Sequence, residues 1–121
     1  MVEKTIINII RRYLHALPAY GIHARQAVLF GSCVRGQNQA WSDIDLVVIA
    51  PEFDGRPTVQ QVKQLWIATG VTDNRIEPIP CGEKEWETQS GRPILEIARR
   101  EGLLISPEQD EAPLHPPSRS L

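Results

Sequence analysis

Residues 29–50 read LFGSCVRGQNQAWSDIDLVVIA and carry the clearest structural signal in the sequence. The apolar residues before Gly31-Ser32 predict a short strand over residues 25–30 that ends in a tight turn. Residues 44–50 predict a second strand, which is apolar and β-branched on both faces beyond its first residues. Such a strand is typical of a sheet covered on both sides, so this stretch predicts the centre of an α/β domain.

The flanking sequence predicts helices and further strands. An amphipathic stripe predicts a helix over residues 3–17, and Pro57 with Gly70 brackets another over residues 57–69. We expect this second helix to face the core with Val59, Val62, Leu65 and Trp66. The other expected elements are helical turns at 32–38 and 83–89, a strand at 75–79, a helix at 93–101 and a short strand at 103–105. Pro78 indicates that the strand at 75–79 lies at an edge of the sheet or that Pro78 is near the strand's end. This order predicts an α/β fold with a small mixed β-sheet flanked by helices.

The length and composition of the chain predict one globular domain. Its 121 residues suit a single domain, which we place at residues 1–106. Residues 107–121 are rich in proline and acidic side chains and poor in apolar ones, so we expect a disordered tail. The formal net charge of −2 provides no general positive field, which argues against nucleic acid as a partner, although a small local basic patch could still bind it.

Cysteine content and hydropathy indicate the cellular compartment in which we expect the protein. Cys33 and Cys81 are too few for a disulfide framework and lack metal-ligand spacing, which favours a reducing compartment. The N-terminus does not read as a signal peptide, and the longest apolar run is too short to cross a bilayer. We therefore expect a cytoplasmic protein without membrane association.

Acidic residues mark the starts of two predicted strands. Asp43 and Asp45 are two residues apart, so their side chains would share one face of a strand, with Cα atoms about 6.6–7 Å apart. Glu77, on the third predicted strand, could supply a third carboxylate. Hard carboxylate oxygens suit Mg²⁺, and such sets can hold two ions about 3.5–4 Å apart for phosphoryl transfer. The alternatives are turn chemistry for the aspartates and a solvated edge residue for Glu77.

In combination, these motifs carry a resemblance. Gly31-Ser32, Arg35-Gly36 and the run Ser42-Asp43-Ile44-Asp45-Leu46, with Glu77 as third acid, resemble the DNA polymerase β-type nucleotidyltransferase superfamily. Within it, the chain is similar to the minimal nucleotidyltransferases of prokaryotes over residues 3–105. Cys33 departs from the basic or small residue that often follows the Gly-Ser pair, which leaves one phosphate contact unfilled.

The resemblance implies roles for the acidic residues. Asp43 and Asp45 would bind two Mg²⁺ ions, and Glu77 would bind one of them and help activate an acceptor hydroxyl. The acceptor would attack the α-phosphate of ATP, and a nucleoside monophosphate would be transferred. The protein would contribute positioning and charge stabilisation rather than a covalent intermediate.

The resemblance also implies a nucleotide site. The backbone of Gly31 and the hydroxyl of Ser32 would hold the β- and γ-phosphates, and Arg35 would neutralise the departing pyrophosphate. A surface charge is the alternative for Arg35. Trp41 could stack a nucleobase, with packing as its alternative.

Similar proteins pair with a HEPN-domain ribonuclease toxin and act as antitoxins by adenylylating a tyrosine of that toxin. The present chain lacks the HEPN Arg…His-x-Tyr motif, because His15 is followed by Ala16-Leu17, so it would be the antitoxin. It also lacks the second domain of aminoglycoside nucleotidyltransferases, which favours a protein acceptor supplied in trans.

Other hypotheses stay open at this point. The chain could be a catalytically silent module that neutralises its partner by contact, or it could transfer the nucleotide to a small molecule or an RNA end. Asp43→Asn distinguishes the first of these from an enzyme, since a contact-only module keeps its activity. The preferred nucleotide, the acceptor and the oligomeric state are not given by the sequence.

Overall fold

The computed structural model describes residues 3–36, 42–72, 74–88, 91–107 and 112–113 of the chain. Trp41, the predicted base-stacking residue, lies outside these ranges. Among the described helices, none has the length and apolar character needed to cross a membrane.

A mixed sheet forms the centre of the molecule, in the strand order β3-β2-β1-β4-β5. The pair β2–β3 is parallel, whereas β1–β2, β1–β4 and β4–β5 are antiparallel. The strands are β1 (Gln26–Phe30), β2 (Ile44–Ile49), β3 (Ile76–Cys81), β4 (Leu103–Ile105) and β5 (Ala112–Pro113). The predicted α/β fold with a small mixed sheet is confirmed, and β3 is an edge strand, as Pro78 indicated.

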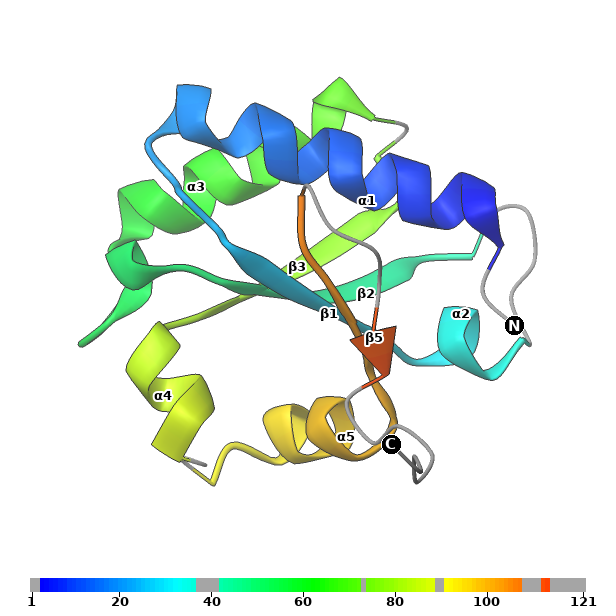
Figure 1. The fold of residues 1–121 in the computed structure, drawn as a ribbon. Coiled ribbons are helices and arrows are strands. Elements are labelled where there is room, and N and C mark those ends of the chain that lie inside the picture. The colour runs from blue at the N-terminus through cyan, green and yellow to red at the C-terminus, as the bar shows by residue number, and fades with distance from the viewer. Residues whose placement is uncertain (1–2, 37–41, 73, 89–90, 108–111, 114–121) are drawn as a thin grey trace, which may run out of the picture.

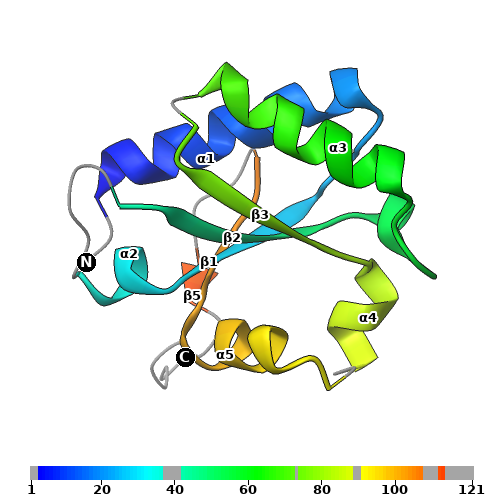
Figure 2. The same ribbon diagram turned by 180° about the vertical axis from the view of Figure 1, so that it is seen from behind.

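Helices cover both faces of this sheet (Figures 1 and 2). One face carries α1 (Lys4–Ala16) and α3 (Val59–Ile67), and the other carries α4 (Glu83–Thr88) and α5 (Pro93–Glu101). A single turn, α2 (Ser32–Arg35), follows β1 directly. Short 3-10 turns complete the chain at η1 (Leu17–Tyr20), η2 (Pro51–Phe53) and η3 (Ala68–Val71). The sheet therefore separates two hydrophobic clusters, the larger one lying under α1.

The predicted core face of α3 is wrong in part. Leu65 is fully buried, but Val59 is 75% exposed and Trp66 is 47% exposed. Figure 2 shows α3 lying over the edge strand β3, so only one narrow side of the helix reaches the core. Ala68, which follows the helix, is buried on that same side. Sequence periodicity identified a helix but assigned its buried side too broadly.

The C-terminal stretch contains a strand that the sequence did not predict. Within residues 107–121, expected to be a disordered tail, Ala112–Pro113 pairs with Leu104 and Leu103 as β5. Just before it, Ser106 and Pro107 are bonded to α1, because their carbonyl oxygens contact Arg11 Nε at 3.4 Å and His15 Nε2 at 3.1 Å.

Candidate active site

Parallel pairing brings two of the predicted acids side by side. The β2–β3 register places Asp45 directly opposite Glu77 near the start of both strands. Asp43 stands just before β2, two residues ahead of Asp45. Asp45 is half-buried, whereas Asp43 and Glu77 are exposed. Because parallel strands align their like ends, two acids far apart in the sequence meet at one end of the sheet.

The carboxyl groups of this end influence each other. Burial raises the pKa of Asp45, the charge of Asp43 raises it further, and a hydrogen bond with Glu77 and the charge of Arg35 oppose the rise. The pKa of Glu77 is also raised, by burial first and then by the charges of Asp43 and Asp45 and the hydrogen bond with Asp45. The pair therefore holds a proton more tightly than isolated carboxyl groups do.

Gly31 gives the Asp45 carboxylate its space. Its φ of +82° and ψ of −152° belong to a region that only glycine adopts readily. A Cβ atom at this position would lie 2.5 Å from Asp45 Oδ2. The antiparallel pair Phe30–Asp45 explains this proximity, since Gly31 follows Phe30 directly. The Gly-Ser turn and the second aspartate are thus one packed unit, with Ser32 half-buried at the first residue of α2.

Arg35, which is predicted to contact pyrophosphate, forms an ion pair with a different acidic residue, Glu101. Its Nη1 donates to Glu101 Oε1 at 2.9 Å, and the two side chains are 48% and 35% exposed. Its positive charge also lowers the pKa of Asp45. The contact with pyrophosphate stays a prediction.

Two residues without a predicted role at the site hold the segment that carries Asp43. The Nε of Arg75 donates to the carbonyl oxygen of Ser42 at 3.0 Å, and the thiol of Cys33 donates to that of Asp43 at 3.6 Å. Burial raises the pKa of Cys33, which keeps the thiol protonated and able to donate. Arg75 stands two residues before Glu77 in the sequence, but its contact with Ser42 emerges only when the strands are paired.

The donor chemistry of this end suits a hard divalent cation. Asp43, Asp45 and Glu77 offer only carboxylate oxygens, the ligands that Mg²⁺ prefers. The missing Cβ of Gly31 leaves room for Asp45 Oδ2 itself at this end of the sheet. Over the residues that the structure describes, no group of three or more His, Cys, Asp or Glu side chains is arranged as a metal site. Metal binding by these three residues therefore stays a prediction.

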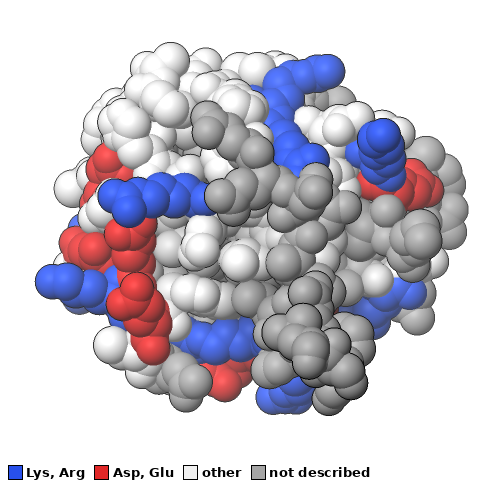
Figure 3. Space-filling model, in the orientation of Figure 1, with Lys and Arg blue, Asp and Glu red and all other residues white. Residues whose placement is uncertain are grey.

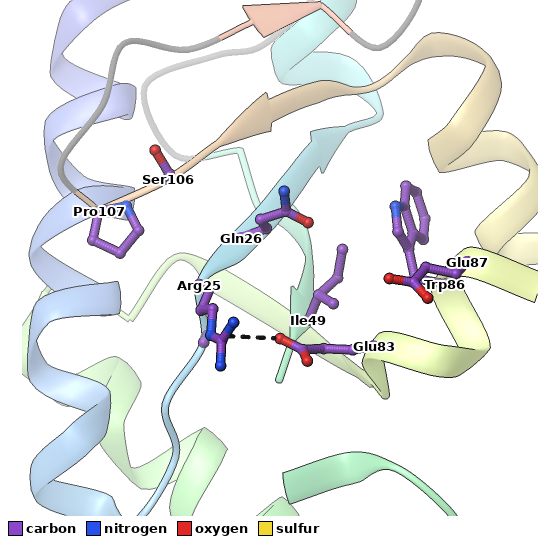
Figure 4. A pocket seen from close by; sticks show the side chains of 9 residues that line it. Arg25, Gln26, Ile49, Glu83, Trp86, Glu87, Ser106 and Pro107 are labelled. Atoms are coloured by element: carbon purple, nitrogen blue, oxygen red, sulfur yellow. Dashed lines mark ion pairs between the residues drawn. The ribbon is translucent and has the colours of Figure 1, made fainter. Parts of the chain in front are cut away.

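A separate hollow of about 550 Å³ lies at the other end of β2, and Figure 4 shows the residues that line it. Its floor includes Ile49, which follows Asp45 by four residues and so by about 13 Å along the strand. One wall carries Glu83 and Trp86 of α4, and Arg25 faces Glu83 across a loose ion pair of 3.9 Å. No residue of the acidic end lines this hollow.

Basic side chains do not gather on the face seen in Figure 3. Lysine and arginine side chains lie apart from one another there, and several are interspersed with acidic ones. Over the described part of this face, the structure shows no basic stripe of the kind that follows a nucleic acid backbone.

Comparison with known proteins connects this geometry to a family. The solved structures that match include a candidate nucleotidyltransferase from Sulfolobus solfataricus, with a TM-score of 0.51 and 14% sequence identity. That match covers 69% of this chain and 73% of the other, and it supports the fold alone. None of the curated proteins matches significantly. The family model for the nucleotidyltransferase domain matches residues 9–97, which include the Gly-Ser turn and all three acids. The chain therefore belongs to the nucleotidyltransferase domain family.

Proposed function

We propose that this protein transfers AMP from ATP to a hydroxyl group of a partner protein, with Mg²⁺ as cofactor. Family membership supports nucleotidyl transfer in general. The observation that carries the proposal is the in-register pair Asp45–Glu77, which lies beside the Gly31 turn and two residues after Asp43. Nucleotidyltransferase domains generally use nucleotide substrates and divalent metals, and this end of the sheet offers suitable groups for both.

Each side chain has a defined task in the proposed reaction. Asp43 and Asp45 would hold two Mg²⁺ ions, and Glu77 would hold one of them and help activate the attacking hydroxyl by accepting its proton. Gly31 and Ser32 bind the β- and γ-phosphates. Bound Mg²⁺ supplies positive charge that neutralises the phosphate oxygens. The acceptor oxygen bonds to the α-phosphorus, and the bond from that phosphorus to the bridging oxygen of the β-phosphate breaks.

Pyrophosphate leaves in this reaction, and Arg35 would stabilise its charge. Arg35 ends the single helical turn that follows Gly31, and its charge lowers the pKa of Asp45. A guanidinium presents several donors to phosphate oxygens in a fixed geometry. It would exchange part of its contact with Glu101 for the leaving group.

A protein acceptor fits the exposure of the acidic residues. Asp43 and Glu77 are exposed, and Glu77 lies on the edge strand β3, so a side chain on another protein can approach them. The resemblance to antitoxins that adenylylate HEPN-domain toxins favours a tyrosine of such a toxin as the acceptor. On this proposal, the protein acts as an antitoxin in the cytoplasm.

A labelling experiment tests the proposal. The protein is incubated with Mg²⁺, ATP labelled at the α-phosphate, and the product of the neighbouring gene or a host lysate. A labelled partner that disappears with Asp43→Asn but persists with Glu87→Gln, an exposed glutamate outside the site, supports AMP transfer. Label that arrives only from the γ-phosphate identifies a kinase and refutes nucleotidyl transfer.

Neutralisation of the partner by contact alone is the second candidate function. The presence of all three acids, Asp43, Asp45 and Glu77, argues against it. Under this alternative, Asp43→Asn still protects the partner and no label is transferred.

A further inference from the structure

The segment Ser42–Ile44, which carries Asp43, is held at three consecutive residues. The carbonyl oxygen of Ser42 accepts a hydrogen bond from Arg75 Nε at 3.0 Å. The carbonyl oxygen of Asp43 accepts one from Cys33 Sγ at 3.6 Å. The amide of Ile44 donates to the carbonyl oxygen of Arg75 at 2.8 Å. Side chains from two neighbouring elements therefore hold the residues that lead into β2.

These contacts lie where the regular pairing of the sheet begins. The β2–β3 register starts at Ile44, and the β1–β2 register includes Asp45 as its first β2 residue. Asp43 precedes both, and its side chain is exposed. Its backbone is therefore oriented by Arg75 and Cys33, in addition to the strand that follows it.

We propose that Arg75 and Cys33 are positioning residues that fix the backbone of Asp43 so that its carboxylate stays beside Asp45 and Glu77. The inference rests on the proposed function, because the alignment matters only if the three carboxylates share a ligand. Neither residue touches the reacting groups in this scheme. Each acts through the orientation of Asp43.

The two contacts link the parts of the site that must act together. Arg75 leads into β3, which carries Glu77, so its guanidinium ties the start of β3 to the Asp43 segment. Cys33 belongs to α2, which follows Gly31, so its thiol ties the turn proposed to bind phosphate to the same segment. Cys33 is 1% exposed in the core under α1, so its side chain has little freedom to leave this position.

This arrangement gives the departure at Cys33 a physical explanation. The resemblance left position 33 as an unfilled phosphate contact, because a basic or small residue is common there. Here the side chain points to the carbonyl oxygen of Asp43 instead. A thiol reaches further than a serine hydroxyl because its C–S bond is longer, so serine is expected to restore the contact only in part.

The chain offers a matched control for each positioning residue. Cys81 is also buried at 1% exposure and donates to a carbonyl oxygen, that of Gly82 at 3.3 Å. Arg92 donates from Nη2 to the carbonyl oxygen of Pro80 at 3.0 Å, near the other end of β3. Cys33→Ala is therefore compared with Cys81→Ala, and Arg75→Lys with Arg92→Lys. Lysine keeps the charge but not the planar guanidinium.

The experiment measures Mn²⁺ binding to the full chain by calorimetry, together with the Mg²⁺ dependence of AMP transfer and the melting temperature. We expect Arg75→Lys and Cys33→Ala to weaken Mn²⁺ binding and raise the half-saturating Mg²⁺ by about 10-fold, as loss of residues that orient metal ligands does. Cys33→Ser should recover part of the loss. The two control variants should keep the wild-type Mn²⁺ affinity even where their melting temperatures fall.

The possible outcomes separate this inference from the function on which it rests. One outcome overturns only the inference about Arg75 and Cys33. In that outcome, the wild type binds Mn²⁺ and transfers AMP, Asp43→Asn does neither, and the Arg75 and Cys33 variants match their controls. A wild-type chain that binds no Mn²⁺ and transfers no AMP overturns the proposed function itself. Weaker Mn²⁺ binding confined to the Arg75 and Cys33 variants, with partial recovery in Cys33→Ser, supports the positioning role.

Discussion

The two ends of β2 have the same kind of backbone pairing but opposite electrostatic character. At its start, Asp45 lies opposite Glu77, so two acids face each other. At its end, Ile49 lies opposite Cys81, and both side chains are almost fully buried. The acid that follows this end, Glu52, has a cationic partner when His23 is protonated, at 2.7 Å.

The pKa directions express the same contrast. At the start of β2, burial and neighbouring acids raise the pKa of both Asp45 and Glu77. Beyond its end, burial opposes the shift, but hydrogen bonds from His23 and its charge lower the pKa of Glu52. The folded state therefore disfavours the ionised forms of Asp45 and Glu77 at the start of β2. It stabilises the ionised form of Glu52 beyond the end of β2. Groups that cost stability are characteristic of sites retained for function.

The largest expected effect comes from Asp45→Asn. Removing this carboxylate should lower AMP transfer by at least about 100-fold, because even residues that only orient metal ligands cost 10–100-fold. The melting temperature at neutral pH should stay the same or rise, because the substitution removes a negative charge beside Glu77. Transfer kinetics and thermal melting of the same preparations measure both effects.

Glu52→Gln serves as the control at the other end of β2. Its effect on the melting temperature should have the opposite sign to that of Asp45→Asn. It should leave transfer intact and lower the melting temperature slightly, because it weakens the contact with His23. A marked fall in melting temperature for Asp45→Asn would show that Asp45 is structural and would contradict the contrast between the two ends.

Gly31→Ala should impair both folding and activity. A Cβ there meets Asp45 Oδ2 at 2.5 Å, and the backbone conformation itself costs about 1–3 kcal/mol for residues other than glycine. Gly55→Ala is the matched control, because Gly55 also has a positive φ of +85° but no atom within 4 Å of the added Cβ. Chemical denaturation and transfer assays should show a larger loss at Gly31, and equal losses would exclude a specific contact with Asp45.

The sequence predicted those parts of the site that lie within single elements. The spacing of Asp43 and Asp45 and the Gly-Ser turn before them were visible without a structure. The sequence also singled out Glu77, but its register with Asp45 depends on how two strands pair across an intervening helix. The contacts of Arg75 and Cys33 with this segment are likewise long-range, and a local pattern that predicts an element does not reveal them.

The limits of fold prediction have a similar cause. Helix α1 was predicted closely because one strong apolar stripe packs on the sheet, and Ile6, Ile10 and Tyr13 are buried. The buried side of α3 was predicted wrongly in part, at Val59 and Trp66, because the exposure of this helix depends on its position over an edge strand. Hydrophobic spacing specifies which residues share a helix face, but the size of the surface beneath decides how many are covered.

The pH dependence of stability should differ in sign between the two ends of β2. The folded state holds the proton of the Asp45–Glu77 pair more tightly than the unfolded state does. The contribution of this pair to the free energy of unfolding therefore falls as the pH rises. The fall begins at about pH 4, the usual carboxyl pKa, and continues through the raised pKa values that the pair has in the folded state. Asp45→Asn should flatten this fall, as measured by melting from pH 4 to 8. A fall of the same size in both proteins would remove the pair as its cause.

The smallest expected effect is the pH dependence that Glu52 contributes. Its lowered folded pKa makes a contribution that is present above about pH 4 and is lost as pH falls through the lowered value. The His23 side chain is 63% exposed, so the pair should contribute less than about 1 kcal/mol at neutral pH. Denaturant unfolding of Glu52→Gln and wild type should therefore differ slightly at pH 6 and converge toward pH 3. A difference that grows as the pH falls would mean that Glu52 is not stabilised in its ionised form, and the two ends of β2 would then respond to protons alike.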